Sequence, residues 1–115
     1  MTAKELYFIG GSLDDLRDFP DDARREAGHQ LHLVQLGETP DDWKPMTSVG
    51  RGVYEIRIHT AVEHRVLYLS KHQEGIYVLH AFQKTTRQTR QADIDLARER
   101  LKALNEARRA AKRRE

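Results

Sequence analysis

Apolar and polar residues alternate along the middle of the chain, between residues 53 and 90. In the first segment, Val53 to His59, one set of alternate positions is apolar and the other is charged or polar: Tyr54, Ile56 and Ile58 against Glu55, Arg57 and His59. Successive side chains of a strand point to opposite faces, so this pattern predicts a strand with one buried face and one charged face.

The next two segments are more apolar. Around Arg65, both sets of alternate positions carry apolar side chains, such as Val66 and Leu67, which is typical of a strand in the centre of a sheet. The third segment, Ile76 to Phe82, is the most apolar of the three. Strict alternation would place one set of its residues on a single face: Ile76, Val78, His80, Phe82 and, just beyond, Lys84.

The first part of the chain is mainly helical in its spacing. Lys4 to Ile9 predicts a short strand, and Ser12 then suits the N-cap of a short helix because its hydroxyl can accept a hydrogen bond from a backbone N–H. From Pro20 to Leu36 apolar residues recur at helical intervals, at Ala23, Ala27, Leu31 and Val34. Gly37 is a favourable stop. The pattern predicts a strand followed by a helical hairpin.

Glu38 to Gly52 is punctuated by prolines, glycines and paired acids, which predicts a loop with Trp43 as a hydrophobic plug beneath it. After Arg90 the helical spacing returns, at Ile94, Ala97, Leu101 and Leu104. This predicts an amphipathic C-terminal helix that becomes basic from about residue 98. We expect its last turns, Arg108 to Glu115, to be a solvated helix end.

The order of these elements predicts an α+β fold. We expect a small, mainly antiparallel sheet of about four strands, an N-terminal helical hairpin on one face of it, and a C-terminal helix, with the helices packed on one face. The chain has 115 residues. This length predicts a single domain over residues 1–115.

Composition narrows the function classes. The chain has no cysteine, which excludes disulfides, thiolate metal sites and cysteine nucleophiles and fits a cytoplasmic protein. Its six histidines lack the spacing of the common zinc motifs, and no phosphate-binding or dinucleotide-binding glycine loop is present, so we expect no metal and no cofactor. Its apolar runs are far too short for a membrane helix or an export signal.

Charge is distributed unevenly along the chain. Residues 1–50 hold five Lys and Arg against ten Asp and Glu, whereas residues 98–115 hold eight against three. An acidic front and a basic back indicate an anionic partner that approaches one side of the molecule.

Five cations lie on or just beyond the predicted strands: Arg57, Arg65, Lys84, Arg87 and Arg90. Arginine presents a planar fork that matches phosphate oxygens, and lysine presents a mobile point charge. If these side chains converge, they would bind a backbone phosphate and stabilise the extra charge of its transition state. The alternative is that each cation is solvated or pairs with Glu55 or Glu63.

The same segments resemble the RelE/ParE superfamily of type II toxins, in particular its HigB-like branch of phage-related toxins. The resemblance is carried by GVYEIRI, by Arg65 followed by VLYL, by IYVLHAFQKTTRQT, by the helix DIDLARERL, and by SLDDLRDFPDDARREAGHQLHLVQLGE and DWKP in the front half. It spans about residues 5–105. Many members carry two lysines where this chain has Lys84 followed by Thr85.

The resemblance implies a toxin that cleaves mRNA on the ribosome without a metal and is held inactive by a cognate antitoxin, expected to be a small helix-turn-helix protein. The ribose 2′-OH would attack its own 3′-phosphate and leave a cyclic phosphate and a free 5′-OH. The phosphate ligands carried over to this chain are Arg57, Arg65, Lys84 and Arg87, with Arg90 as a further RNA contact.

The proton acceptor is less defined by the sequence. His80 is the first candidate general base, because its ordinary pKa lies near neutrality and it shares the predicted face of Lys84. The alternative is a histidine packed beside Phe82, and Glu55 and His59 are second choices. Phe82 would stack on a base, or else pack in the core.

Two other functions fit the same residues. One is a topoisomerase poison from the other branch of the superfamily, which would damage DNA without cutting mRNA. The other is a non-catalytic module that binds RNA or a protein partner, with salt-sensitive affinity and no cleavage.

Overall fold

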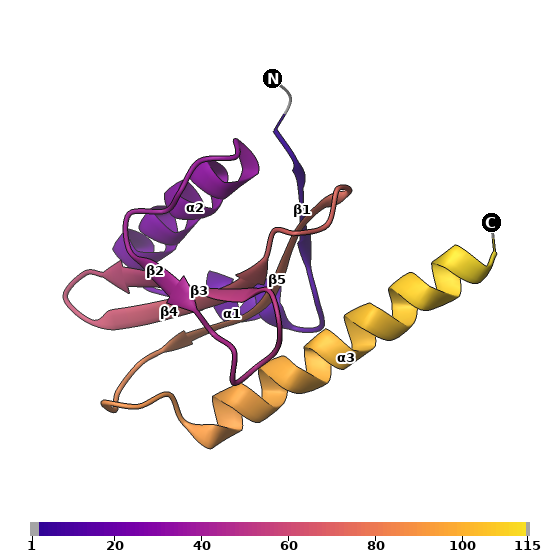
Figure 1. Cartoon of the computed structure of the whole chain (residues 1–115). Helices are drawn as coiled ribbons and strands as arrows, with labels where there is room; N and C mark the ends of the chain where they lie inside the picture. The colour runs from indigo at the N-terminus through magenta and orange to yellow at the C-terminus, as the bar shows by residue number, and fades with distance from the viewer. Residues whose placement is uncertain (1–2, 115) are drawn as a thin grey trace.

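The computed structural model describes residues 3–114 (Figure 1). The elements follow in the order β1 (Glu5–Phe8), α1 (Ser12–Arg17), α2 (Asp21–Gln35), β2 (Trp43–Pro45), β3 (Val53–His59), β4 (Glu63–Leu69), β5 (Gly75–Gln83) and α3 (Gln91–Arg113). The α+β class and the element order from β3 to α3 agree with the sequence pattern. Glu115, which belongs to the predicted basic tail, lies outside the described residues.

The strands form one five-stranded sheet in the order β1-β5-β4-β3-β2. The pairs between β2 and β5 are antiparallel, but β1 lies parallel to β5, so the sheet is mixed. The prediction of four strands omitted β2. This three-residue strand lies inside the predicted loop and pairs with Tyr54 to Ile56 of β3. Trp43 begins this edge strand, is 42% exposed and lies edge-on to Tyr54, so it is not a plug beneath a loop.

The helices cover both faces of the sheet, which corrects the expectation of one covered face (Figure 1). α1 packs on β5, and α2 packs on β3 and β5. The predicted hairpin is therefore a short helix and a long helix that both rest on the sheet. The face of α2 that was predicted from helical spacing is buried, at Ala23, Ala27, Leu31 and Val34. α3 packs on the opposite face through Ala97 and Leu104.

The start of α1 differs from the sequence prediction. Ser12 is the first residue of the helix, its side chain makes no cap, and its hydroxyl donates a hydrogen bond to the Val78 carbonyl on β5. The serine thus ties α1 to the sheet. Gly37 ends the α2 region with φ of +81°, a left-handed conformation that favours glycine.

A β-bulge changes which side chains share a face on β5. Leu67 of β4 pairs with His80, but the next residue, Tyr68, pairs with Val78, so Leu79 is an extra residue. Ile76 and Val78 therefore face α2, whereas the residues beyond the bulge include a His80–Phe82 stack on the α3 side. The expected common face for Ile76, Val78, His80 and Phe82 is wrong, because alternation is interrupted between them.

Among residues 3–114, none of the helices has the length and apolar character needed to cross a lipid bilayer.

Candidate functional site

Three neighbouring strands, β2, β3 and β4, bring cations to the α3 face of the sheet, and Lys84 follows the fourth strand, β5. Arg57 of β3 lies directly opposite Arg65 of β4, and Arg65 lies opposite Phe82 of β5. At the other side, Lys44 of β2 lies opposite Glu55 of β3. Directly paired residues share a face of the sheet, so the register alone gathers these side chains.

Glu55 is the centre of this group, and its side chain is 0% exposed. Its Oε1 lies 3.3 Å from Arg57 Nε and 3.5 Å from Arg65 Nε. Lys44 Nζ lies 3.9 Å from the same oxygen. A buried carboxylate requires paired positive charge, and here three strands supply it. We name these four residues, together with Lys84, the cation cluster.

The cation cluster is not fully satisfied in its hydrogen bonds. Within residues 3–114, Glu55 Oε2 and Arg65 Nε find no hydrogen-bond partner although both are buried. Arg65 Nη1 donates to Glu63 Oε1 at 3.0 Å and to the His64 carbonyl at 3.0 Å. An unpaired buried polar atom is costly, so such atoms mark either strain or a place for a ligand.

Lys84 follows β5 and completes the cluster. Its backbone N–H donates to the Glu63 carbonyl at 2.8 Å, which fixes the start of the segment that leads to α3. Burial lowers the pKa of Lys84, and the positive charge of Arg65 lowers it further, while Glu55 partly opposes the shift. Lys44 and Arg57 act in the same direction as Arg65. An amine of this kind gives up its proton more readily than an ordinary lysine.

Phe82 and His80 lie side by side next to the cluster. Phe82 is 8% exposed and packs in the core beneath α3, with the His80 ring stacked on it at 4.8 Å. His80 Nε2 lies 2.8 Å from Asp93 Oδ1 on α3, and His80 Nδ1 lies 3.4 Å from Asp15 Oδ2 on α1. Both ring nitrogens of His80 thus face carboxylates, and the residue links three elements.

The remaining predicted cations lie apart from the centre. Arg87 is exposed on the segment between β5 and α3. Arg90 is exposed at the N-cap of α3 and donates to the Thr85 hydroxyl. The structure therefore gathers Arg57, Arg65 and Lys84, and leaves Arg87 and Arg90 on the exposed connection.

A second polar chain reaches Arg65 from the end of the β3–β4 hairpin. His59 contacts Asp42 through Nε2 and lies 2.8 Å from Glu63 through Nδ1. The hydrogen bond to Asp42, followed by that to Glu63, raises the pKa of His59. The bond from His59 lowers the pKa of Glu63, which also accepts from Arg65. In residues 3–114, no group of three or more His, Asp or Glu side chains is arranged to hold a metal ion.

Sequence reasoning missed Lys44 and ranked Glu55 only as a second choice. Lys44 belongs to the short DWKP run, whose proline and acids are typical of a loop. Its pairing with Glu55 depends on β2 joining the sheet edge.

The sequence matches one family model, described as Phage derived protein Gp49-like (DUF891), over residues 14–102. The match covers most of the chain and includes the whole cation cluster. The chain belongs to this family. The family is toxin-like, of the RelE/HigB type, and points to a phage-derived toxin of a toxin–antitoxin system with a cognate antitoxin as partner. No curated protein matches the chain significantly.

Proposed function

We propose that this chain is a ribosome-dependent mRNA endoribonuclease of the HigB-like branch, the toxin of a type II toxin–antitoxin system. The observation that supports this best is the convergence of Arg57, Arg65, Lys44 and Lys84 at one buried carboxylate. Family membership supports the toxin class, and the cluster supports the chemistry.

The cation cluster suits a phosphodiester whose charge increases during reaction. Arg57 and Lys84 are only partly buried, so their heads can reach an RNA phosphate at the surface. Arg65, held by Glu55 and Glu63, supplies a preoriented guanidinium behind them. Donors that are fixed before the reaction stabilise the developing charge without reorganisation, and removing one typically slows such reactions by about 10²–10³-fold.

We assign the proton transfer to Lys84. Glu55 has no exposed surface, and both ring nitrogens of His80 face carboxylates, whereas Lys84 is partly exposed and has a lowered pKa. Its neutral amine takes the proton of the ribose 2′-OH as the 2′-oxygen bonds to phosphorus. The bond from phosphorus to the 5′-oxygen breaks, and that oxygen takes a proton from solvent. The new ammonium then lies beside the phosphate when its negative charge is greatest.

The remaining residues position these groups. His80, placed between Asp93 and Asp15, keeps Phe82 oriented beside Arg65, and the buried Phe82 ring supports that guanidinium from the core side. Only Arg57, Lys44 and Lys84 of the cluster reach the surface, so the ribosome supplies the orientation of the mRNA that the small protein lacks. Arg87 and Arg90 provide outer contacts to the RNA backbone, and the activity takes place in the cytoplasm, where ribosomes and mRNA meet.

The test is cleavage of a defined mRNA on purified ribosomes, with fragment ends labelled directly by polynucleotide kinase. Wild-type protein should give fragments with free 5′-OH ends, which label without prior phosphatase treatment. The double variant Arg57→Ala/Lys84→Ala should lose cleavage while circular dichroism and the urea midpoint show a folded protein.

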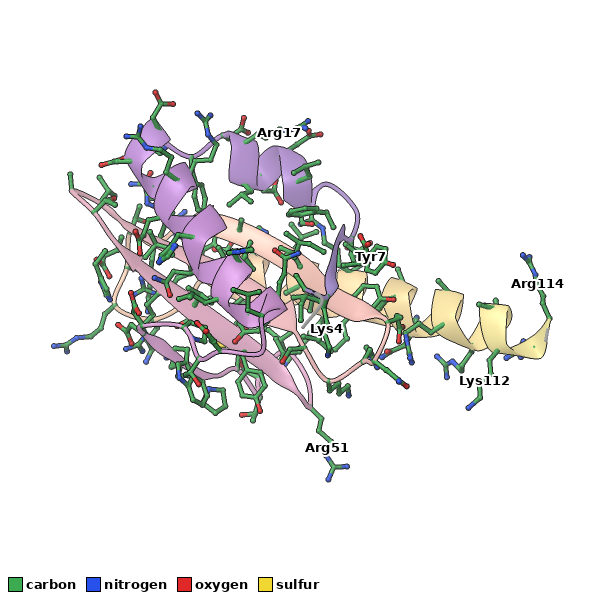
Figure 2. The ribbon with its side chains drawn as sticks, turned by 90° about the horizontal axis from the view of Figure 1, so that it is seen from above. Lys4, Tyr7, Arg17, Arg51, Lys112 and Arg114 are labelled. Atoms are coloured by element: carbon green, nitrogen blue, oxygen red, sulfur yellow. The ribbon has the colours of Figure 1, made fainter. Side chains whose placement is uncertain are left out.

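A matched control is Arg51→Ala/Lys71→Ala. It also removes two cations, near the start of β3 rather than its end, and Arg51 points away from the molecule (Figure 2). Cleavage should be unchanged in this control. Fragments that persist in the Arg57/Lys84 variant would exclude the cluster as the active site. DNA damage without mRNA fragments would instead support the hypothesis of a topoisomerase poison.

A further inference from the structure

α3 continues well beyond the core that it helps to form. The last buried residue of the helix is Leu104, and within residues 105–114 none is buried. Figure 1 shows the C-terminal half of α3 extending past the sheet, and Figure 2 shows Lys112 and Arg114 on this projecting part. Helical stability in proteins comes mostly from packing of an apolar face. The projecting half is tied to the sheet by the ion pair of Arg108 with Glu74, and no side chain of residues 105–114 is buried.

A groove runs between this half of α3 and the neighbouring edge of the sheet. Its volume is about 800 Å³. Ile9 and Tyr77 line the sheet side, and Leu104 with three alanines at intervals of four, Ala103, Ala107 and Ala111, lines the helix side. Residues four apart lie on one face of a helix, so the alanines form a continuous strip. Small side chains there allow another helix to approach closely.

The rim of the groove is positively charged. Arg108 is already paired, since it donates to Glu74 at 2.8 and 3.2 Å, and this contact lowers the pKa of Glu74 to about 2. Lys112 lines the groove without such a pair among the described ion pairs. Arg114 is exposed and lies seven residues after Ala107, a spacing that places it on the face of the alanines. Lys112 and Arg114 would therefore attract an anionic partner.

We infer that this groove binds an acidic amphipathic helix of a protein partner, with the partner's apolar side on the alanine strip and its carboxylates on the cationic rim. The apolar floor favours this occupant over RNA, because a phosphate backbone would use the cations and leave Ile9, Leu104 and Tyr77 uncovered. Ala103 to Ala111 spans about 12 Å at 1.5 Å per residue, enough for about two turns of a partner helix.

The identification of this partner as the antitoxin rests on the proposed function. The preference of the groove for an acidic amphipathic helix does not depend on that function. The groove lies at the end of α3 away from Asp93, which contacts His80 near the cation cluster. A partner held here would be captured without contacting Lys84, and other parts of it would have to cover the cluster.

The test measures binding of two fluorescently labelled peptides to the purified full chain by anisotropy. The first is an acidic helical peptide with leucines at three- and four-residue intervals and glutamates elsewhere. The second has the same composition but its leucines are spread around the helix. The first should bind more than about tenfold tighter, since only its leucines can be buried together on the alanine strip.

Two variants that add the same charge to different faces of α3 provide the matched comparison. Ala111→Glu places a carboxylate in the groove, and Asn105→Glu places one on an exposed position on the side of α3 away from the alanine strip. We expect Ala111→Glu to weaken binding of the first peptide by about tenfold or more, because it opposes like charges and blocks the strip. Asn105→Glu should weaken it by less than about threefold.

Equal binding of both peptides, equal effects of the two variants, or no binding of the first peptide would each overturn the inference. A single-stranded DNA oligonucleotide serves as the competitor. If it displaces the first peptide completely, and if both variants weaken its own binding equally, the surface binds nucleic acid instead. None of these measurements requires cleavage of RNA. A protein that does not cleave RNA can still bind the first peptide, and a protein that cleaves RNA can fail to bind it.

Discussion

The molecule gathers positive charge in two places that differ in burial. In the cation cluster, Arg65 is 6% exposed and shares the fully buried Glu55 with Arg57 and Lys44. At the projecting end of α3, Arg109, Arg113 and Arg114 are exposed to solvent. The residue types are the same, but protein atoms surround the charges in the cation cluster, whereas water surrounds them at the end of α3.

This difference determines what each region can do. In the cluster, burial strengthens every interaction, lowers the pKa of Lys84 and fixes the arginines before a ligand arrives. At the end of α3, solvent screens the charges, and the side chains remain free to adapt to a partner. We therefore assign chemistry to the first region and recognition to the second.

Replacing Glu55 with Gln should be strongly destabilising. The change leaves Arg65 buried with no charged partner except Glu63, and loss of one member of a buried ion pair typically costs about 3–5 kcal/mol. Urea unfolding monitored by circular dichroism measures the free energy of unfolding. The control Glu106→Gln, on an exposed position of α3, should change it by less than about 0.5 kcal/mol. Equal stabilities for the two variants would contradict the central role of Glu55.

Replacing Lys84 with Arg should slow ribosome-dependent cleavage by about 10²–10⁴-fold, the usual contribution of general acid–base catalysis. Arginine keeps the charge but does not release its proton, so this variant separates proton transfer from phosphate binding. With its pKa lowered, Lys84 is neutral in a larger fraction as pH rises, and the wild-type rate should increase with pH until that pKa is passed. Lys112→Arg is the matched control and should cleave normally. A Lys84→Arg variant with full activity would rule out the proposed base.

Replacing His59 with Gln should reduce stability in a pH-dependent way. Its pKa is raised in the folded protein, so its contribution is complete below its ordinary pKa of 6.5 and is lost as pH rises through the raised value. The difference in melting temperature between wild type and variant should therefore be larger at low pH than at high pH. Half-exposed pairs of this kind contribute at most about 1 kcal/mol. A difference that grows toward high pH would refute this account.

Replacing Arg109 with Gln should slightly stabilise the end of α3. The change removes a repulsion with Arg113 at a spacing of four residues, which is worth about 0.2–0.5 kcal/mol, and leaves Arg113 in the last turn, where its charge favours the helix. Amide hydrogen exchange of the projecting residues should slow by up to about twofold. Faster exchange in this variant would show that Arg109 stabilises the free helix.

Elements with a local hydrophobic pattern were predictable from the sequence. Helical spacing at Ala23, Ala27, Leu31 and Val34 identified α2, and alternation identified β3 to β5, because a side chain's burial repeats with the geometry of its own element. The apolar character of both sides of β4 placed it correctly in the middle of the sheet. Arg57, Arg65 and Lys84 were recognisable as a set because each lies on or just after a strand of that sheet.

Which of these residues meet depends on the folded sheet and could not be predicted from local pattern. Lys44 joins the cluster because a three-residue edge strand pairs with Glu55, and His80 turns toward Asp93 because a bulge adds Leu79 to β5. Neither event leaves a periodic signal in the sequence. In the sequence, Glu55 is typical of a charge on a solvated strand face. In the fold, cations from neighbouring strands surround it and bury it. Burial depends on contacts between residues distant in the chain, and burial is what separates a cation held by protein atoms from a solvated one.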